Sequence, residues 1–198
     1  MSDQTDWQVR PLTAERWPDL ERLFGPRGAC GGCWCMYWRL PRKVFNANLG
    51  EANRCALQQL CQADPAPGLI GYMGDEPVAW CALGPREAYP VLERSRVLKR
   101  VDDLPVWSVV CFFVARRWRH RCLTVRLLSA ACEYAAQHQA VLVEGYPVAP
   151  AAGKTPADVF VYTGLASAFS QAGFIEVARH SPTRPIMRFI IKHSSETK

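Results

Sequence analysis

The chain has 198 residues, of which 49% are hydrophobic and 21% charged, and its net charge is +6. This composition is typical of a globular protein, and the length favours a single domain over residues 1–198. No apolar run approaches the ~20 residues that a bilayer-spanning helix needs, and the polar N-terminus does not resemble a secretory signal. Nine cysteines without an export signal favour free thiols in a reducing compartment, so we expect a cytoplasmic protein.

The first half of the chain predicts a strand, two helices and a hairpin. Residues 5–13 alternate in polarity, as a strand does, and Thr13 is placed to cap a helix over 14–24 that Gly25 closes. A segment rich in glycine, cysteine and tryptophan follows at 25–41. Residues 48–62 carry apolar side chains at helical spacing, and 69–85 read as two strands around a Gly-Asp-Glu-Pro turn.

The second half predicts a strand–helix–strand crossover and a final strand pair. Residues 105–114 are almost continuously apolar, which is typical of a central strand buried on both faces. A helical stripe and a strand at 140–148 follow, so two parallel strands are expected. A helix over 164–173 and strands at 174–181 and 185–191 complete a mixed, twisted sheet of six or seven strands with helices on both faces.

A cluster of cationic residues separates the central strand from the helix after it. Residues 116–121 read Arg-Arg-Trp-Arg-His-Arg. Unpaired N–H groups at a helix start attract phosphates, and the cationic side chains reinforce that attraction. A phosphate-bearing cofactor therefore fits better than a solvated basic turn. Nucleic acid fits less well, because no basic stripe or aromatic platform accompanies the charge.

The run "VARRWRHRCLTVRLL", with "FSQAGF" downstream, resembles the acetyl-CoA site of the GCN5-related N-acetyltransferase (GNAT) family. The resemblance implies a GNAT fold with splayed central parallel strands and acetyl-CoA as co-substrate. Its pyrophosphate would lie on Arg119, His120, Arg121, Cys122, Leu123 and Thr124. Its pantetheine arm would pair with the strand edge formed by Phe112, Phe113 and Val114. The segment "GGCWCMYWR" further resembles a subgroup with an early Cys-Trp-Cys segment.

Four positions depart from the family pattern. Cys122 replaces a glycine that lets the backbone approach phosphate, and Thr124 replaces glycine or alanine. Ser108 stands where many relatives have a glutamate base, and Phe169 where many have a tyrosine acid. Because both customary proton-handling groups are missing, a non-catalytic relative that only binds CoA or another ligand is the alternative.

Two other residues are the best candidates for proton transfer. An amine must lose a proton before it attacks a thioester, and the departing thiolate must gain one. Glu144, on the strand parallel to 105–114, is the candidate base, although a strand-end salt bridge explains it equally well. Tyr162, at the start of the last helix, is the candidate acid, although it could equally be a packing residue.

The cysteine-rich segment contributes candidate substrate contacts. Cys30, Cys33 and Cys35 lack a second pair at zinc-ribbon spacing, so no metal is expected and buried thiols are favoured over a zinc site. The segment could instead form a lid over the acceptor. The candidate acceptor-binding residues are Trp34, Trp38, Trp107 and Tyr146. The expected partner is a small-molecule or peptide amine, without nucleic acid or membrane, in a possible homodimer.

Overall fold

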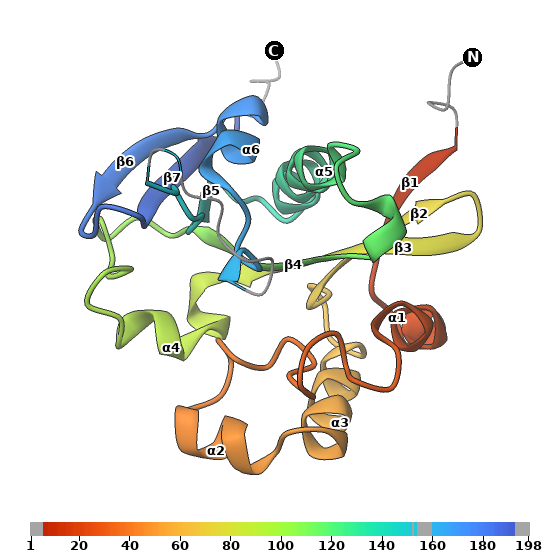
Figure 1. Cartoon of the computed structure of the whole chain (residues 1–198). Coiled ribbons are helices and arrows are strands. Elements are labelled where there is room, and N and C mark those ends of the chain that lie inside the picture. The colour runs from red at the N-terminus through yellow and green to blue at the C-terminus, as the bar shows by residue number, and fades with distance from the viewer. Residues whose placement is uncertain (1–5, 152, 154–159, 193–198) are drawn as a thin grey trace.

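A computed structural model describes residues 6–151, 153 and 160–192. Its centre is a seven-stranded sheet in the order β1-β2-β3-β4-β5-β7-β6 (Figure 1). The strands are β1 (Trp7–Pro11), β2 (Gly68–Met73), β3 (Glu76–Pro85), β4 (Trp107–Val114), β5 (Leu142–Gly145), β6 (Ile175–Arg179) and β7 (Pro185–Ile190). Neighbours are antiparallel except β4 and β5, which are parallel.

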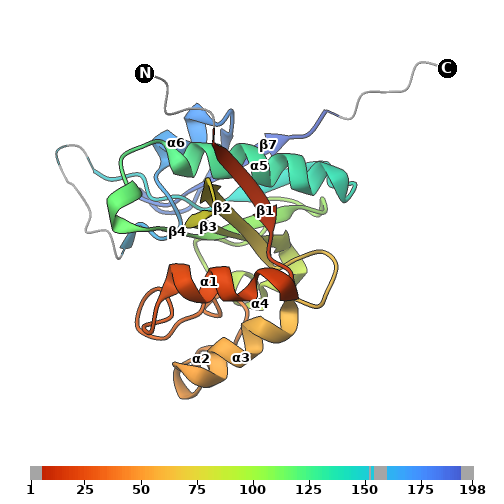
Figure 2. The ribbon, with the colours of Figure 1, turned by 90° about the vertical axis from the view of Figure 1, so that its right-hand side faces the viewer.

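Helices cover both faces of this sheet (Figures 1 and 2). One face carries α1 (Trp17–Phe24), α2 (Arg42–Ala47), α3 (Glu51–Leu60) and the short α4 (Pro90–Glu93). The other face carries α5 (Leu123–Gln137) and α6 (Ala166–Gln171). Short 3-10 turns with described bounds lie at Ala14–Arg16, Arg86–Ala88 and Arg116–Trp118. None of the helices among the described residues is both long and apolar enough to cross a membrane.

Each face of the sheet has its own apolar core. On the α5 side, Leu127, Leu128 and Ala131 form a buried stripe along one face of the helix, which packs on β3 and β4. On the α1 side, the core is aromatic and includes Trp17, Trp34 and Trp80. A mixed sheet with a helix-covered apolar core on each face is the α/β fold class expected from the sequence, which is thereby confirmed.

The parallel strands β4 and β5 separate after a short paired stretch. They pair only from Trp107–Val143 to Val109–Gly145, whereas β4 continues to Val114. The β3–β4 register also shifts between Val109 and Cys111, which indicates a bulge in β4 where the two strands part. The expected splay of the central strands is therefore present.

Several local predictions were wrong. Thr13 makes no side-chain cap; its hydroxyl instead accepts a hydrogen bond from Arg16. Helix α2 was not expected, because its six residues are too few for a periodic pattern. The helix after β4 begins at Leu123, so residues 119–121 precede its first turn. The strand expected over 140–148 is limited to β5.

Candidate functional site

The turn between β4 and α5 presents unused backbone donors. His120 (φ 60°) and Cys122 (φ 56°) both adopt positive φ, and Cys122 is the N-cap of α5. Within the described chain, the N–H groups of Cys122, Leu123 and Thr124 donate to no backbone or side-chain acceptor. Such a row of N–H groups at the start of a 15-residue helix favours an anion.

Cationic side chains surround this turn and tie it to neighbouring elements. Arg119 donates from Nε to the carbonyl of Val114 at 3.1 Å. The guanidinium of Arg121 lies 4.7 Å from the Trp118 ring centroid. Arg117 pairs with Glu76 on β3, which neutralises part of the charge. The side chains of the turn therefore give it a net positive charge close to the unused amides.

The free edge of β4 is partly occupied by the segment before α6. The Phe112 N–H donates to the carbonyl of Tyr162 at 2.6 Å, and Val148 forms a parallel bridge with Leu165. Residues 162–165 therefore fill space between the end of β4 and the continuation of β5. Because N–H directions alternate along a strand, the N–H of Val114 points to the same side as that of Phe112. No described backbone carbonyl accepts from it outside the strand pairing.

Glu144 lies at the centre of a buried charge network. Its side chain is 1% exposed, and one carboxylate oxygen accepts from Arg86 Nη1 at 3.0 Å and from Tyr146 Oη at 2.7 Å. The other oxygen accepts from Arg188 Nε at 2.7 Å. Tyr146 also shares a 2.8 Å hydrogen bond with Ser108, a buried residue of β4.

The network extends outward to the surface. Arg188 forms a two-pronged pair with Asp102, at 2.5 and 3.0 Å, and Arg86 donates to Glu93 at 2.8 Å. The two arginines therefore connect buried Glu144 on β5 to surface carboxylates. Neither arginine was singled out from the sequence, since single arginines in a loop and a strand carry no spacing signal.

Tyr162 lies beside the bulge of β4, half-buried against the aromatic core. Its ring is 6.1 Å from that of Tyr37 in an edge-to-face arrangement. Burial raises the pKa of the Tyr162 phenol, and the positive charges of Arg184 and Arg42 act in the opposite direction. The hydroxyl is therefore protonated at neutral pH, as an acid must be before it acts.

The four aromatic acceptor candidates do not share one surface. Trp34 stacks on Trp17 at 5.8 Å inside the α1-side core, and Trp38 packs edge-on against Tyr37 at 5.0 Å. Trp107 lies on the opposite face of the sheet, 5.9 Å from Tyr134 of α5. Tyr146 is fully buried in the charge network. Of these four, only Trp38 lies beside the Tyr37–Tyr162 pair.

The cysteine cluster is a set of thiols without a metal-binding geometry. Cys35 donates to Cys111 Sγ at 3.4 Å and accepts from Trp80 Nε1 at 3.1 Å. All nine cysteines are free, and among the described residues no group of histidine, cysteine or acidic side chains could hold a metal ion. Neighbouring thiols and burial raise the pKa of Cys33 and Cys35, so both stay protonated.

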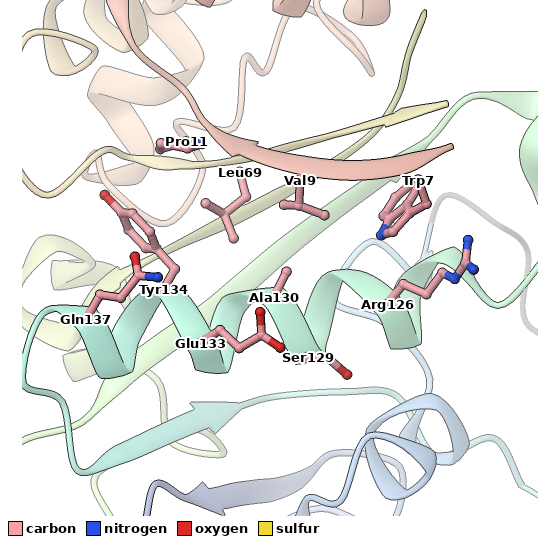
Figure 3. A pocket seen from close by; sticks show the side chains of 10 residues that line it. All are labelled: Trp7, Val9, Pro11, Leu69, Arg126, Ser129, Ala130, Glu133, Tyr134 and Gln137. Atoms are coloured by element: carbon pink, nitrogen blue, oxygen red, sulfur yellow. The ribbon is translucent and has the colours of Figure 1, made fainter. Parts of the chain in front are cut away.

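A separate groove of about 460 Å³ lies between β1 and α5 (Figure 3). Trp7 and Arg126 lie at one end, with the guanidinium 5.6 Å from the indole centroid, and Tyr134 lies at the other. The residues that line it come from β1, β2 and α5 and include none of the candidate site residues. The groove is therefore distinct from the β4–β5 split.

No protein-family model matches the chain. No curated protein matches it either. Solved structures do match in fold. A GNAT-family acetyltransferase from Streptococcus agalactiae aligns with a TM-score of 0.56 at 12% identity, covering 94% of this chain and 96% of that one.

Two further structures carry ligands in their own crystals. The PaiA N-acetyltransferase from Thermoplasma acidophilum, in complex with coenzyme A, aligns with a TM-score of 0.52 at 11% identity, covering 94% of this chain and all of that one. A putative acetyltransferase from Salmonella typhimurium, with its cofactor acetyl-CoA, aligns with a TM-score of 0.51 at 12% identity, covering 98% and 99%. The chain therefore has the fold of GNAT acetyltransferases.

Proposed function

We propose that the protein is an acetyl-CoA-dependent N-acetyltransferase that transfers an acetyl group directly to an amine. The observation that carries this proposal is the turn at Cys122–Thr124, whose unused N–H groups lie at the end of a splayed central strand. A pyrophosphate there would accept from these amides with Arg119 and Arg121 beside it. The presence of CoA or acetyl-CoA in two structures of the same fold supports this assignment.

The pantetheine arm would follow the free edge of β4 from Val114 toward the bulge. Val114 would supply an N–H to the arm. Phe112 supplies its N–H to Tyr162 in this structure, so the arm would have to replace that contact or bypass it. A bulge re-aims the strand, which would bring the thioester near Cys111 and Tyr162.

Tyr162 is our candidate for the acid that protonates the departing CoA thiolate. Its phenol is neutral at neutral pH and half-buried next to Cys111 of β4. Glu144 stays a prediction as the base. Its two oxygens already accept three hydrogen bonds, so it would act on the amine only through Tyr146 and Ser108. The assigned step removes one proton from the amine and returns one to the thiolate.

A catalytically degenerate binding protein is the second candidate. Phe169, at the position where many relatives carry a tyrosine acid, is fully buried against Phe112 and Phe174. It has no hydroxyl, and Ser108 has no carboxylate. This candidate keeps the phosphate turn and a CoA or other ligand but has no turnover.

The first experiment measures melting temperature and alkylation of cysteines with and without acetyl-CoA. We expect acetyl-CoA to raise the melting temperature and to slow iodoacetamide labelling of exposed Cys122, because the pyrophosphate would cover it. Exposed Cys30 and Cys55 are internal controls that should label at an unchanged rate. Equal labelling of all three, with no thermal shift at millimolar acetyl-CoA, would count against both candidates.

A second measurement separates the two candidates. The release of free CoA thiol is followed with a panel of amines, and the products are identified by mass. Acetylation of any amine, with loss of turnover in Tyr162→Phe, supports the enzyme. Binding of acetyl-CoA without turnover on the whole panel supports the degenerate relative.

A further inference from the structure

Two arginines without an acidic partner in the described part of the chain lie near the tyrosine pair beside the β4 bulge. We name these side chains the guanidinium–phenol cluster: Tyr37, Arg42, Tyr162 and Arg184. Arg42 opens α2, and its guanidinium carbon lies 4.7 Å from the Tyr37 ring centroid. Tyr37 in turn contacts Tyr162 edge-to-face. The members come from three distant parts of the chain, so only folding brings them together.

Arg184 reaches the cluster from the turn between β6 and β7. The carbonyl of its neighbour Thr183 accepts from the Ala149 N–H at 2.9 Å, which holds the turn next to the chain that leaves β5. The guanidinium is half-buried, and its charge acts on the phenols of both Tyr37 and Tyr162. Burial lowers the pKa of Arg184, because a cation loses hydration there.

Neither guanidinium has an anionic partner among the described residues. No described carboxylate pairs with Arg42 or Arg184, and the hydrogen bond that Arg184 donates, to the Ser181 carbonyl at 3.1 Å, comes from its backbone N–H. By contrast, Arg86 and Arg188 each pair with two carboxylates, and Arg54 pairs with Glu21 and Glu51. A half-buried cation without a carboxylate has a desolvation cost that a bound anion would offset.

Two buried hydrogen-bond donors next to the cluster have no partner among the described residues. The indole Nε1 of Trp38 is buried and makes no hydrogen bond with the described residues, and the Trp38 ring packs 5.0 Å from Tyr37. The hydroxyl of Thr163, the residue after Tyr162, is also buried without a partner among them. Both groups are therefore free among the described residues to bond with a polar ligand that reached them.

We infer that the guanidinium–phenol cluster binds an anionic group, a carboxylate or a phosphate, carried by the acceptor amine. This inference rests on the proposed acetyl transfer, because the cluster lies where Tyr162 contacts β4 beside the bulge. Guanidinium groups form strong charge-assisted hydrogen bonds with both kinds of anion. The acceptor class is then an amino acid, a peptide C-terminus or a phosphorylated amine, and not a simple polyamine, whose cationic chain the two arginines would repel.

The test compares pairs of related acceptors with and without the anion. Thiol release from acetyl-CoA is measured with L-amino acids against their C-terminal amides, and with O-phosphoethanolamine against ethanolamine. We expect the anionic member of at least one pair to have a kcat/KM about tenfold or more higher, which is the effect of one charge-assisted hydrogen bond. The two arms distinguish carboxylate from phosphate recognition.

Arginine variants then assign the preference to the cluster. Arg184→Gln should reduce the anionic preference about tenfold, mainly through KM, while Arg184→Lys retains part of it. Arg10→Gln, which changes an exposed arginine on the opposite edge strand β1, is the matched control and should leave the preference unchanged.

The thermal shift with acetyl-CoA is measured on every variant. A normal shift together with equal rates on charged and uncharged acceptors, or with no anionic acceptor acetylated at all, overturns the inference and leaves cofactor binding intact. An unchanged preference in Arg184→Gln also overturns it. If acetyl-CoA does not raise the melting temperature of the unmodified protein, the proposed function itself is refuted.

Discussion

At the scale of single residues, Cys122 shows how a departure from a family pattern is accommodated. Its φ of 56° lies in the left-handed region that glycine adopts without cost. The family's glycine is thus explained by backbone geometry as well as by phosphate approach, and the cysteine keeps the geometry. Its side chain is exposed, so the turn itself is not disrupted.

We predict that Cys122→Gly stabilises the protein and tightens acetyl-CoA binding. A non-glycine residue in this conformation costs roughly 1–2 kcal/mol, and the greater freedom of glycine in the unfolded chain offsets part of it. The net gain should be about 1 kcal/mol or less, measured by urea unfolding, with a lower Kd by calorimetry.

Cys122→Ala is the control for this change. It removes the sulfur but keeps Cβ in the left-handed conformation, so neither stability nor affinity should rise. If alanine and glycine behave alike, the backbone conformation of residue 122 is not what limits cofactor binding.

At the scale of elements, the segment 162–165 determines how open the central split is. Gly164, at φ +85°, lets this segment lie against two aromatic rings: a Cβ there would sit 2.9 Å from Phe169 and 3.1 Å from Phe112. The close approach also places Phe169 against Gly145 at the end of β5. Small residues at these two contacts thus permit α6 to dock onto the parted strands.

We predict that Gly164→Ala loosens this docking. The added methyl group must displace an aromatic ring, which typically costs about 1–3 kcal/mol beyond the backbone penalty. Urea unfolding measures the loss of stability. Because the contact between Tyr162 and Phe112 depends on this segment, the affinity for acetyl-CoA should change as well.

Gly25→Ala is the matched control, since Gly25 has φ +64° but an added Cβ there would have no neighbouring atom within 4 Å. Its backbone conformation (φ 64°, ψ −172°) is one that almost only glycine adopts, so the variant carries a backbone penalty alone, about 1–3 kcal/mol. Equal losses in the two variants would mean that the aromatic contacts at Gly164 do not matter.

At the scale of the whole molecule, the Glu144 network joins both halves of the sheet. It links β5 and β7 to the 3-10 turn after β3 through Arg188 and Arg86. A buried carboxylate between two guanidinium groups is costly to disturb, because removal of one charge leaves the others uncompensated. The network therefore holds the separated halves in a defined geometry.

We predict that Glu144→Gln lowers the free energy of unfolding by about 3–5 kcal/mol, as measured by urea denaturation. Glu87→Gln removes an exposed partner of Arg100 and should change it by less than about 1 kcal/mol. A Glu144→Gln protein with unchanged stability but without turnover would instead assign Glu144 to the chemistry.

Much of the fold could be read from periodicity. The apolar run of β4, the stripe of α5 and the order of seven strands depend on local side-chain patterns, which the folded chain preserves. The short helix α2 could not be predicted, because six residues are too few to show a helical period. The start of α5 could not be predicted either, because no sequence pattern indicates the positive φ of His120.

The amino-acid order by itself determined the sheet, its parallel centre and the cationic turn, because each depends on residues adjacent along the chain. Only the tertiary structure decided which partners the site residues have. Glu144 meets Arg86 and Arg188, Tyr162 meets Phe112, and Tyr37 meets Tyr162. These contacts join residues far apart in sequence, so no local pattern specifies them, and packing of the two cores alone brings them together.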